Sequence, residues 1–585
     1  MIRYFGNVNL TNRRFGDIGT NGCGKFDDLS SDALGKLRAF GITHLWLTGV
    51  LRQATLTDYS RLGLAADVPD IVKGLAGSFY AVRDYYDVCP DYANNPANRM
   101  QEFENLIDRI HAAGMQVLID LVPNHVSRGY SSVVAPQPDL GHNDNPSRFC
   151  DSGNHFYYMP TGKPLRLSRP PWWNPPGFTF TGTFPLENGG AAHPVKVTAN
   201  DLYSYSPDAN SWYDGIKLNY GFNFQTNQGS YEPRPRTWDS IDAILAYWQA
   251  KGVDGFRCDF AHYVPAEAWS YLIAKARNRR AAYFFAEAYP FPGTNDPVHS
   301  LDHLIQAGFD NVYHYQAYNA LKRIYLSGLI DEYDREMLSI TDAMRPHLVS
   351  YLENHDERRV ASPFIPNAVT GDTGFGSLNA GYQLAPLHLL SGNGPALLLN
   401  GQEVGEPGAG DEGFSPAEDG RTTIYDYWAM PEFVKWVNGH RYDGGNLSPE
   451  QLALRRFYGD LFALCQNASV SGSGYWGLWY FNRPQNFFDC PSGLYSFARF
   501  QPGSGAALLV ATNFQYGNGL SGRLRIPREL SAIINLQNNI TVELVLNRTG
   551  SRRDPLGTFT VETLAQSGFP VTVGNQESQV FVLHV

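Results

Sequence analysis

The chain has 585 residues, which exceeds one ordinary domain and predicts two or three. Its net charge of −11 argues against a nucleic-acid partner, which would require a basic surface. The sequence has no run of about 18 apolar residues, so we expect no membrane-spanning helix.

The first ten residues lack the basic and then apolar pattern of a signal peptide. We therefore expect a cytoplasmic protein, or a secreted or periplasmic protein whose signal peptide has been removed. The six cysteines form no CxxC pair, so the sequence suggests neither a disulfide framework nor a zinc site. The oligomeric state is left open.

Helical and strand-like segments alternate along the chain from about residue 34. Apolar residues at helical spacing stop at Gly41, Gly114 and Gly252, and an apolar strand is predicted after each of these glycines. The predicted strands cover residues 42–47, 115–122, 255–259, 282–286, 348–352 and 396–399. Repeated βα units over about 400 residues favour a parallel barrel, although the pattern alone does not exclude an open sheet.

The alternation is broken once, over residues 126–235. This stretch is rich in proline, glycine, asparagine and aromatic residues, as in the run 170–176. A loop of this length is uncommon inside a compact domain, so we expect a small inserted domain after the third strand. After a predicted helix over 449–465, short alternating runs separated by turn residues indicate an antiparallel β-sandwich.

The expected fold is therefore α/β, a (β/α)8 TIM barrel with an inserted domain and a C-terminal all-β domain. The barrel is assigned to residues 1–125 and 236–465, the inserted domain to 126–235, and the C-terminal domain to 466–585. Barrel enzymes place their active sites at the carboxyl ends of the strands. Polar residues at those ends are therefore the first candidates for catalysis.

Four strand ends carry carboxylates, two of them with a histidine nearby. They are the runs 120–125, 255–259, 285–287 and 354–356, which read DLVPNH, GFRCD, FAE and NHD. Asp259 and Glu287 lie 28 residues apart, close to one βαβ repeat of about 30, so they should stand on neighbouring strands. Two such carboxyl groups can protonate a glycosidic oxygen and attack the anomeric carbon, and a separation of about 5–5.5 Å would retain configuration.

In this order, the four runs resemble the signature regions of glycoside hydrolase family 13, the α-amylase family. The resemblance extends over the barrel, the insertion and the C-terminal domain. It implies that Asp259 is the nucleophile, Glu287 the general acid/base and Asp356 the third acid, which holds sugar hydroxyls. It also implies that His125 and His355 hydrogen-bond the sugar at the cleavage point.

The resemblance supplies further candidate substrate-binding residues. Tyr80 resembles the tyrosine that stacks under the sugar, and Asp120 resembles the acid that supports the site from the third strand. Arg257 is expected to keep the nucleophile ionised, because a nearby cation lowers the pKa of an acid. Arg359 occupies a position usual in the family, and the run Lys217–Asn219 resembles the signature that ends the inserted domain.

The match departs from the family just after the nucleophile. Many α-amylases place a histidine four residues after it, but here His262 comes one position early and Tyr263 takes that place. Since that histidine contacts substrate and its backbone helps to hold calcium, both the substrate preference and the calcium are left open. Asn124 matches a calcium ligand of the family, and oxygen ligands suit calcium. Acids in the insertion that could add ligands are Asp139, Asp144 and Asp151.

The resemblance implies a retaining α-glucan hydrolase that cleaves α-1,4 bonds in starch-like polymers or maltooligosaccharides by double displacement. Neighbouring negative charge is expected to keep Glu287 protonated for its role as acid. The alternative is a 4-α-glucanotransferase, in which a second sugar replaces water at the same residues. A non-catalytic glucan-binding relative is a further possibility, but such a relative would be expected to lack one of the three acids, and none is missing. No organic cofactor is expected.

Overall fold

The computed structural model describes the chain except residues 135–138, 290–300, 364–374, 413–418, 467–471 and 473. The described residues form two compact units. The first contains Met1–Val312 and Thr423–Tyr442, and the second contains most of Tyr313–Gly413, Glu418–Thr422 and Asp443–Val585.

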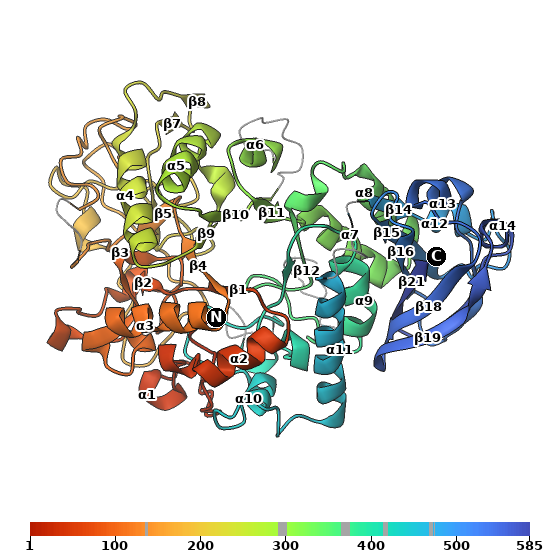
Figure 1. Cartoon of the computed structure of the whole chain (residues 1–585). Coiled ribbons are helices and arrows are strands. Elements are labelled where there is room, and N and C mark those ends of the chain that lie inside the picture. Colours follow the sequence, from red (N-terminus) through yellow and green to blue (C-terminus); the bar gives the residue numbers. More distant parts are fainter. Residues whose placement is uncertain (135–138, 290–300, 364–374, 413–418, 467–471, 473) are drawn as a thin grey trace. The chain divides into compact units, whose positions relative to one another are not determined.

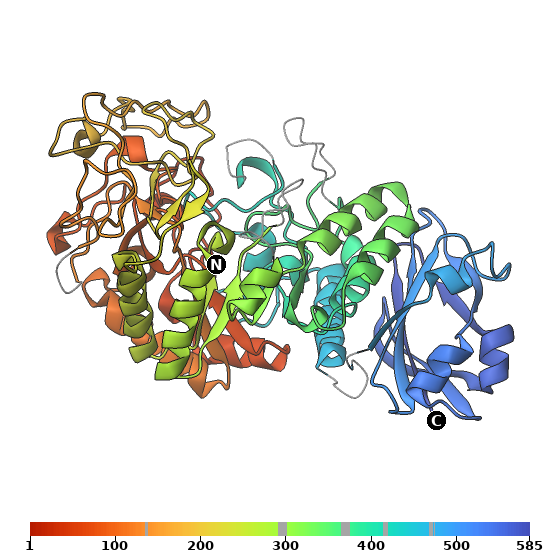
Figure 2. The ribbon, with the colours of Figure 1, turned by 90° about the horizontal axis from the view of Figure 1, so that it is seen from above.

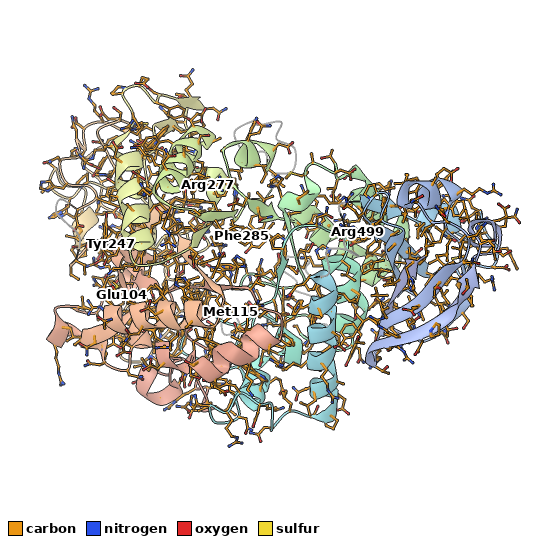
Figure 3. All side chains as sticks on the ribbon, in the orientation of Figure 1. Glu104, Met115, Tyr247, Arg277, Phe285 and Arg499 are labelled. Atoms are coloured by element: carbon orange, nitrogen blue, oxygen red, sulfur yellow. The ribbon has the colours of Figure 1, made fainter. Side chains whose placement is uncertain are left out.

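A parallel sheet organises the first unit (Figure 1). Its strands, in spatial order, are β1 (His44–Leu47), β4 (Gln116–Leu121), β9 (Gly255–Cys258), β10 (Tyr283–Ala286) and β11 (Asn311–Tyr313). Phe285 of β10, labelled in Figure 3, packs edge-on against Trp46 of β1, with ring centroids 6.1 Å apart. The sheet is parallel, as the βα alternation predicts.

Helices of two length classes accompany this sheet in the first unit. The longer helices are α2 (Ser31–Ala39), α3 (Arg99–Ala112), α4 (Arg236–Ala250) and α5 (Ala266–Arg279), and the shorter ones are α1 (Ile18–Asn21), α6 (Leu301–Gln306) and α10 (Pro431–Val437). Ser30 caps α2, and its hydroxyl accepts from the N–H of Ala33 at 3.2 Å. The predicted apolar face of α3 is buried, as shown by Phe103, Leu106, Ile107 and Ile110. The helical periodicity therefore predicts the core-facing sides correctly.

The inserted segment contains little regular structure, and its yellow part in Figure 2 runs mostly as loops. Its antiparallel pairs are β5 (His125–Ser127) with β6 (Gly215–Lys217), and β7 (Phe222–Asn223) with β8 (Gln228–Gly229). Another antiparallel pair in the first unit joins β2 (Leu51–Gln53) to β3 (Val82–Val88). A buried ion pair at 2.7 Å joins Arg128 to Glu187 and so connects two parts of the insertion.

The second unit begins with helices around two parallel strands. The strands are β12 (Leu348–Tyr351) and β13 (Ala396–Leu397), and the helices are α7 (Tyr315–Ser327), α8 (Ile330–Ser339), α9 (Ala380–Leu389) and α11 (Pro449–Cys465). The bounds of α11 are those that the sequence predicts. None of the helices in the described ranges combines the length and hydropathy needed to cross a bilayer.

The C-terminal part of this unit is an antiparallel β-domain, as predicted. Its six-stranded sheet runs in the order β14 (Gly474–Gly477), β15 (Leu494–Phe500), β16 (Ala506–Asn513), β21 (Ser578–His584), β18 (Ile540–Asn547) and β19 (Gly550–Phe559). A second sheet pairs β17 (Leu520–Leu524) with β20 (Phe569–Val573), and the helices are α12 (Trp479–Asn482), α13 (Arg528–Ile534) and α14 (Val561–Gln566). One apolar core, including Leu509, Val542 and Phe569, joins the two sheets. The domain boundaries at residues 126, 236 and 466 stay predictions.

Candidate active site

Three acids from neighbouring strand ends meet around the guanidinium of Arg257. Its Nη1 lies 3.3 Å from Oδ1 of Asp120 and 2.8 Å from Oδ1 of Asp259, and its Nη2 lies 3.0 Å from Oε2 of Glu287. All four residues are buried. The prediction that Asp259 and Glu287 stand on neighbouring strands is confirmed, because β9 pairs with β10.

The backbone positions these two acids side by side. The N–H of Asp259 donates to the carbonyl of Leu121, and the N–H of Glu287 donates to the carbonyl of Cys258, both at 2.9 Å. Each acid thus continues the hydrogen-bonded ladder directly beyond its strand. Adjacent strands lie about 4.8 Å apart, so the two carboxyl groups leave the sheet as close neighbours.

The two carboxyl groups have different environments. Glu287 accepts from the N–H of Phe260 at 2.8 Å and from the hydroxyl of Tyr289 at 3.1 Å, in addition to its Arg257 contact. Asp259 uses Oδ1 for Arg257, whereas its Oδ2 is buried with no hydrogen-bond partner among the described residues. Oδ2 of Asp259 therefore keeps lone pairs that no hydrogen bond among the described residues uses.

Burial raises the pKa of Asp259 well above its ordinary value, and the neighbouring charge of Glu287 adds to this rise. Arg257 acts in the opposite direction but is outweighed, since one guanidinium faces three buried acids. Arg257 lowers the pKa of Asp259, as predicted, but the net shift is upward because burial and Glu287 outweigh it. The prediction that Glu287 is the protonated member stays untested.

Two aromatic rings enclose the Arg257 guanidinium. Its central carbon lies 5.1 Å from the ring centre of Trp46 and 5.3 Å from that of Tyr80. Tyr80 is half-buried, so one part of its ring remains accessible. The sugar stacking expected of Tyr80 stays a prediction. Trp46 was missed as a site residue, although it lies within the predicted strand 42–47.

The two histidines predicted in this unit occupy different positions. His125 is buried beside Asn124, whose amide nitrogen lies 3.1 Å from its Nδ1, and burial lowers its pKa to about 4. The imidazole is therefore neutral at pH 7. His262 is also buried, and its Nδ1 lies 3.3 Å from the backbone carbonyl of Glu287. His262 thus contacts the backbone of Glu287, the acid/base candidate, and its predicted sugar contact stays a prediction.

Half-buried aromatic residues form an aromatic wall beside these acids, defined by Trp212, Phe260, Tyr263 and Tyr289. The rings of Trp212 and Phe260 lie 4.2 Å apart, and those of Trp212 and Tyr263 lie 6.1 Å apart. Sequence reasoning missed Trp212, Phe260 and Tyr289 as site residues. A signal was present for two of them, because Phe260 follows Asp259 directly and Tyr289 follows Glu287 by two positions.

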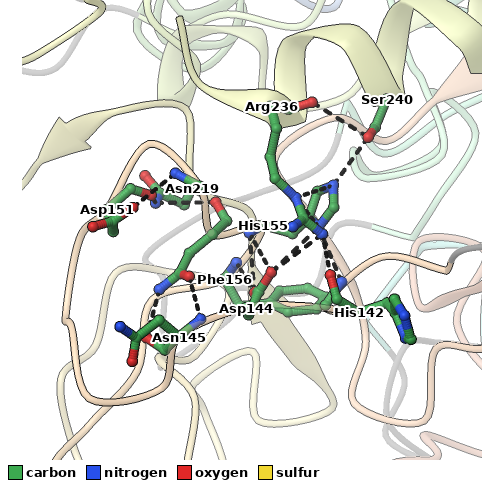
Figure 4. Close-up of polar contacts among 12 residues, drawn as sticks. His142, Asp144, Asn145, Asp151, His155, Phe156, Asn219, Arg236 and Ser240 are labelled. Atoms are coloured by element: carbon green, nitrogen blue, oxygen red, sulfur yellow. Dashed lines mark hydrogen bonds and ion pairs between the residues drawn. The ribbon is translucent and has the colours of Figure 1, made fainter. Parts of the chain in front are cut away.

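The acids suggested as calcium ligands in the insertion accept hydrogen bonds from nearby backbone groups. Asp144 accepts from the N–H groups of His155 and Phe156, and Arg236 lies 3.5 Å from it (Figure 4). Asp139 accepts from the N–H of Ser132, and Asp151 accepts from that of Gly153. Within the described ranges, no group of three or more His, Cys, Asp or Glu residues is arranged to hold a metal ion.

The side chain of Asn124, the predicted calcium ligand, has protein partners at both of its polar atoms. Its side-chain oxygen accepts from the Lys217 ammonium at 2.5 Å, and its amide nitrogen donates to the carbonyl of Ala199 at 2.9 Å. A cationic side chain therefore already contacts this oxygen.

The remaining predicted residues belong to the second unit. His355 is buried, and its Nε2 lies 3.0 Å from Oδ2 of Asp356, whose side chain is 36% exposed. The side-chain oxygen of Asn354 accepts from the N–H of Asp356 at 2.9 Å and fixes this turn. Arg359 is fully buried and pairs with Glu353 at 2.9 Å. The convergence of Asp356 with Asp259, and the sugar contacts of His355 and Arg359, stay predictions.

Comparison with known proteins gives a consistent family signal. A family model described as the α-amylase catalytic domain matches residues 10–283. Alpha-amylase 3 of Dictyoglomus thermophilum is 22% identical over 397 residues, covering 64% of this chain and 64% of that protein. Cyclomaltodextrin glucanotransferase of Bacillus sp. (strain 1011) is 26% identical over 262 residues, covering 45% of this chain and 28% of that protein. The chain spans less than two thirds of the length of these curated relatives.

A solved structure matches over nearly the whole chain. A noncanonic maltogenic alpha-amylase, AmyB from Thermotoga neapolitana, gives a TM-score of 0.57 at 18% identity and covers 96% of this chain and 95% of its own. A likeness at this identity concerns the fold alone. It confirms the predicted (β/α)8 barrel with a C-terminal β-domain.

Proposed function

The chain belongs to the α-amylase family of glycoside hydrolases, and on that basis we propose that it is a retaining α-glucan hydrolase. Its substrates are starch-like polymers or maltooligosaccharides, cleaved at α-1,4 bonds. The proposal rests on the pair of Asp259 and Glu287, whose carboxyl groups both contact the Arg257 guanidinium. Oδ2 of Asp259 has no hydrogen-bond partner among the described residues, so it can attack the substrate. Two adjacent carboxyl groups are the minimum that double displacement requires.

In the first step, Oδ2 of Asp259 bonds to the anomeric carbon while the glycosidic C–O bond breaks. Glu287, as the carboxylic acid, gives its proton to the departing sugar oxygen. The reaction needs one proton for the two acids, and three buried acids around one guanidinium favour such a shared proton. Because Arg257 contacts both carboxyl groups, its charge remains close to whichever of them is ionised.

In the second step, Glu287 has become a carboxylate and takes a proton from water. The resulting hydroxide bonds to the anomeric carbon, and the bond to Asp259 breaks, which regenerates both starting groups. Two inversions at one carbon give net retention of the α configuration. In this scheme Asp356 holds sugar hydroxyls, as the family resemblance implies.

Proton NMR of maltoheptaose hydrolysis tests this proposal. We expect the α anomer of the new reducing end to appear first, with the β anomer following by mutarotation. A β anomer that appears first would contradict retention, and no turnover on maltoheptaose, soluble starch, pullulan or maltotriose would contradict hydrolysis of α-glucans. A chain that binds glucan but turns over none of these substrates would instead be the non-catalytic relative.

The aromatic wall favours a second candidate, a 4-α-glucanotransferase. Its half-buried rings flank Glu287 and offer apolar faces on which an acceptor sugar can stack. An acceptor hydroxyl would then replace water in the second step. Time courses with maltoheptaose separate the two activities, because transfer produces oligomers longer than the substrate early, whereas hydrolysis releases only shorter sugars.

A further inference from the structure

Three oxygen atoms surround the ammonium group of Lys217. Its Nζ lies 2.5 Å from Oδ1 of Asn124, 2.8 Å from Oδ1 of Asp201 and 3.3 Å from the backbone carbonyl of Tyr263. The Lys217 side chain is only 5% exposed. An ammonium group has three N–H donors and no acceptor, so each of its donors has an oxygen within reach.

These oxygens come from separate parts of the first unit. Asn124 follows β4 of the barrel, Asp201 belongs to the insertion, and Tyr263 ends the short 3-10 helix Ala261–Tyr263 that follows Asp259. Lys217 itself ends β6, opposite His125 of β5. The ammonium therefore connects the insertion to the barrel and to the segment that follows the predicted nucleophile.

The charge and the number of ligands suit an ammonium better than a divalent metal ion. The carboxylate of Asp201 balances one positive charge, and the other two ligands are neutral. Calcium takes six to eight oxygens at about 2.3–2.6 Å, so at the three protein oxygens around Nζ it would need about three or more water ligands in addition. The ring of Tyr263 lies 4.8 Å from Nζ and adds a cation–π contact.

We propose that the Lys217 ammonium is the resident cation at this junction, in the position where the resemblance of Asn124 predicts calcium. The junction is therefore complete without a metal ion. Lys217 acts as a positioning residue, since it holds the carbonyl of Tyr263 and does not contact the reacting atoms.

The metal content of the wild-type chain provides the first test. The protein is incubated with calcium chloride, passed through a desalting column and analysed for bound calcium, and its melting temperature is measured in EDTA and in calcium. We expect the same melting temperature in both and no calcium that depends on this junction. Bound calcium that is lost in Asn124→Ala or Asp201→Asn would overturn the proposal.

The second test removes the Lys217 side chain from between its three oxygens. Lys217→Ala leaves three oxygens around a space, so we expect its melting temperature to fall by roughly 3–8 °C and to recover at least in part in calcium chloride. Lys73→Ala is the matched control, because Lys73 is another largely enclosed lysine, 13% exposed, that pairs with an acid, Asp214, at 2.9 Å. This control should fall in melting temperature without recovery in calcium.

Two outcomes of the second test would refute the proposal. One is a calcium-induced rise in melting temperature that is equal in the wild type and Lys217→Ala, because the lysine would then not occupy the cation's position. The other is a Lys217→Ala variant whose melting temperature does not change in calcium chloride, because the three oxygens would then not form a cation site. The wild-type measurement decides the question if the variant does not fold.

Discussion

The guanidinium of Arg257 lies 2.8 Å from the carboxylate of Asp259, in a site where three acids share this single cation. If all three acids were ionised, the site would carry a net charge of −2, which favours protonation of one of them. Burial and the neighbouring Glu287 raise the pKa of Asp259 accordingly. The same arrangement suits a reaction that needs one ionised and one protonated carboxyl group.

Replacing Asp259 by Asn should abolish turnover while preserving the fold. Asparagine has nearly the same shape, but its amide cannot form the glycosyl-enzyme, so we expect kcat on maltoheptaose to fall by roughly 10⁴-fold or more. Steady-state kinetics measure the loss, and circular dichroism verifies folding. Activity within tenfold of wild type would remove Asp259 from the role of nucleophile.

The stability of the wild type should depend on pH through Asp259. Burial and then Glu287 raise its folded pKa, so the folded chain keeps a proton that the unfolded chain releases near pH 3.9. Its stabilising contribution is complete below about pH 3.9 and is lost as pH rises through the raised pKa. The difference in melting temperature, Asp259→Asn minus wild type, should therefore increase as pH rises. Asp108→Asn, at an exposed position, is the control and should show no such trend.

Replacing Arg257 by Met should destabilise the fold strongly. The change leaves three buried acids without their shared cation, and we expect a loss of about 3–5 kcal/mol in the free energy of unfolding. Denaturant titration at pH 7 measures this loss. Arg277, labelled in Figure 3, pairs with Asp310 at the surface, so Arg277→Met should cost about 1 kcal/mol or less. Equal losses in both variants would contradict the shared-cation account.

Local signals predict much of this structure. The helix α11 begins and ends where the sequence indicates, because Ser448 caps it and Pro449 suits its first turn. The strand ends that carry Asp259 and Glu287 are equally clear, since apolar runs of strand length precede both. These features depend on residues close together in the chain.

Features that depend on distant residues could not be predicted. Lys217 matches a family signature, but its contacts with Asn124 and Tyr263 span 93 and 46 residues. The net upward shift in the pKa of Asp259 could not be predicted, because the sequence shows one nearby arginine but not how many acids surround the site. The left-handed φ of 41° at Phe260 has no sequence signal either, since bulky residues rarely adopt it.

His125 should make the protein sensitive to acid. Burial lowers its folded pKa to about 4, below the unfolded value of about 6.5, so the unfolded chain takes up the proton first. Its contribution is complete above about pH 6.5 and is lost as pH falls toward 4, by about 3 kcal/mol. His125→Gln should therefore lose less stability than wild type between these pH values, measured by denaturant titration. The exposed His44→Gln should behave as wild type.

The ring of Phe260 should influence how often an acceptor sugar replaces water. It lies 4.2 Å from the ring of Trp212, and its own N–H, which any residue retains, donates to Glu287. Phe260→Ala should thus lower the ratio of transfer to hydrolysis by about fivefold, because one stacking surface is lost. Phe260→Tyr keeps the ring and should keep the ratio. Oligomer profiles with maltoheptaose at high concentration give this ratio, and an unchanged ratio in Phe260→Ala would show that acceptor sugars do not stack on this ring.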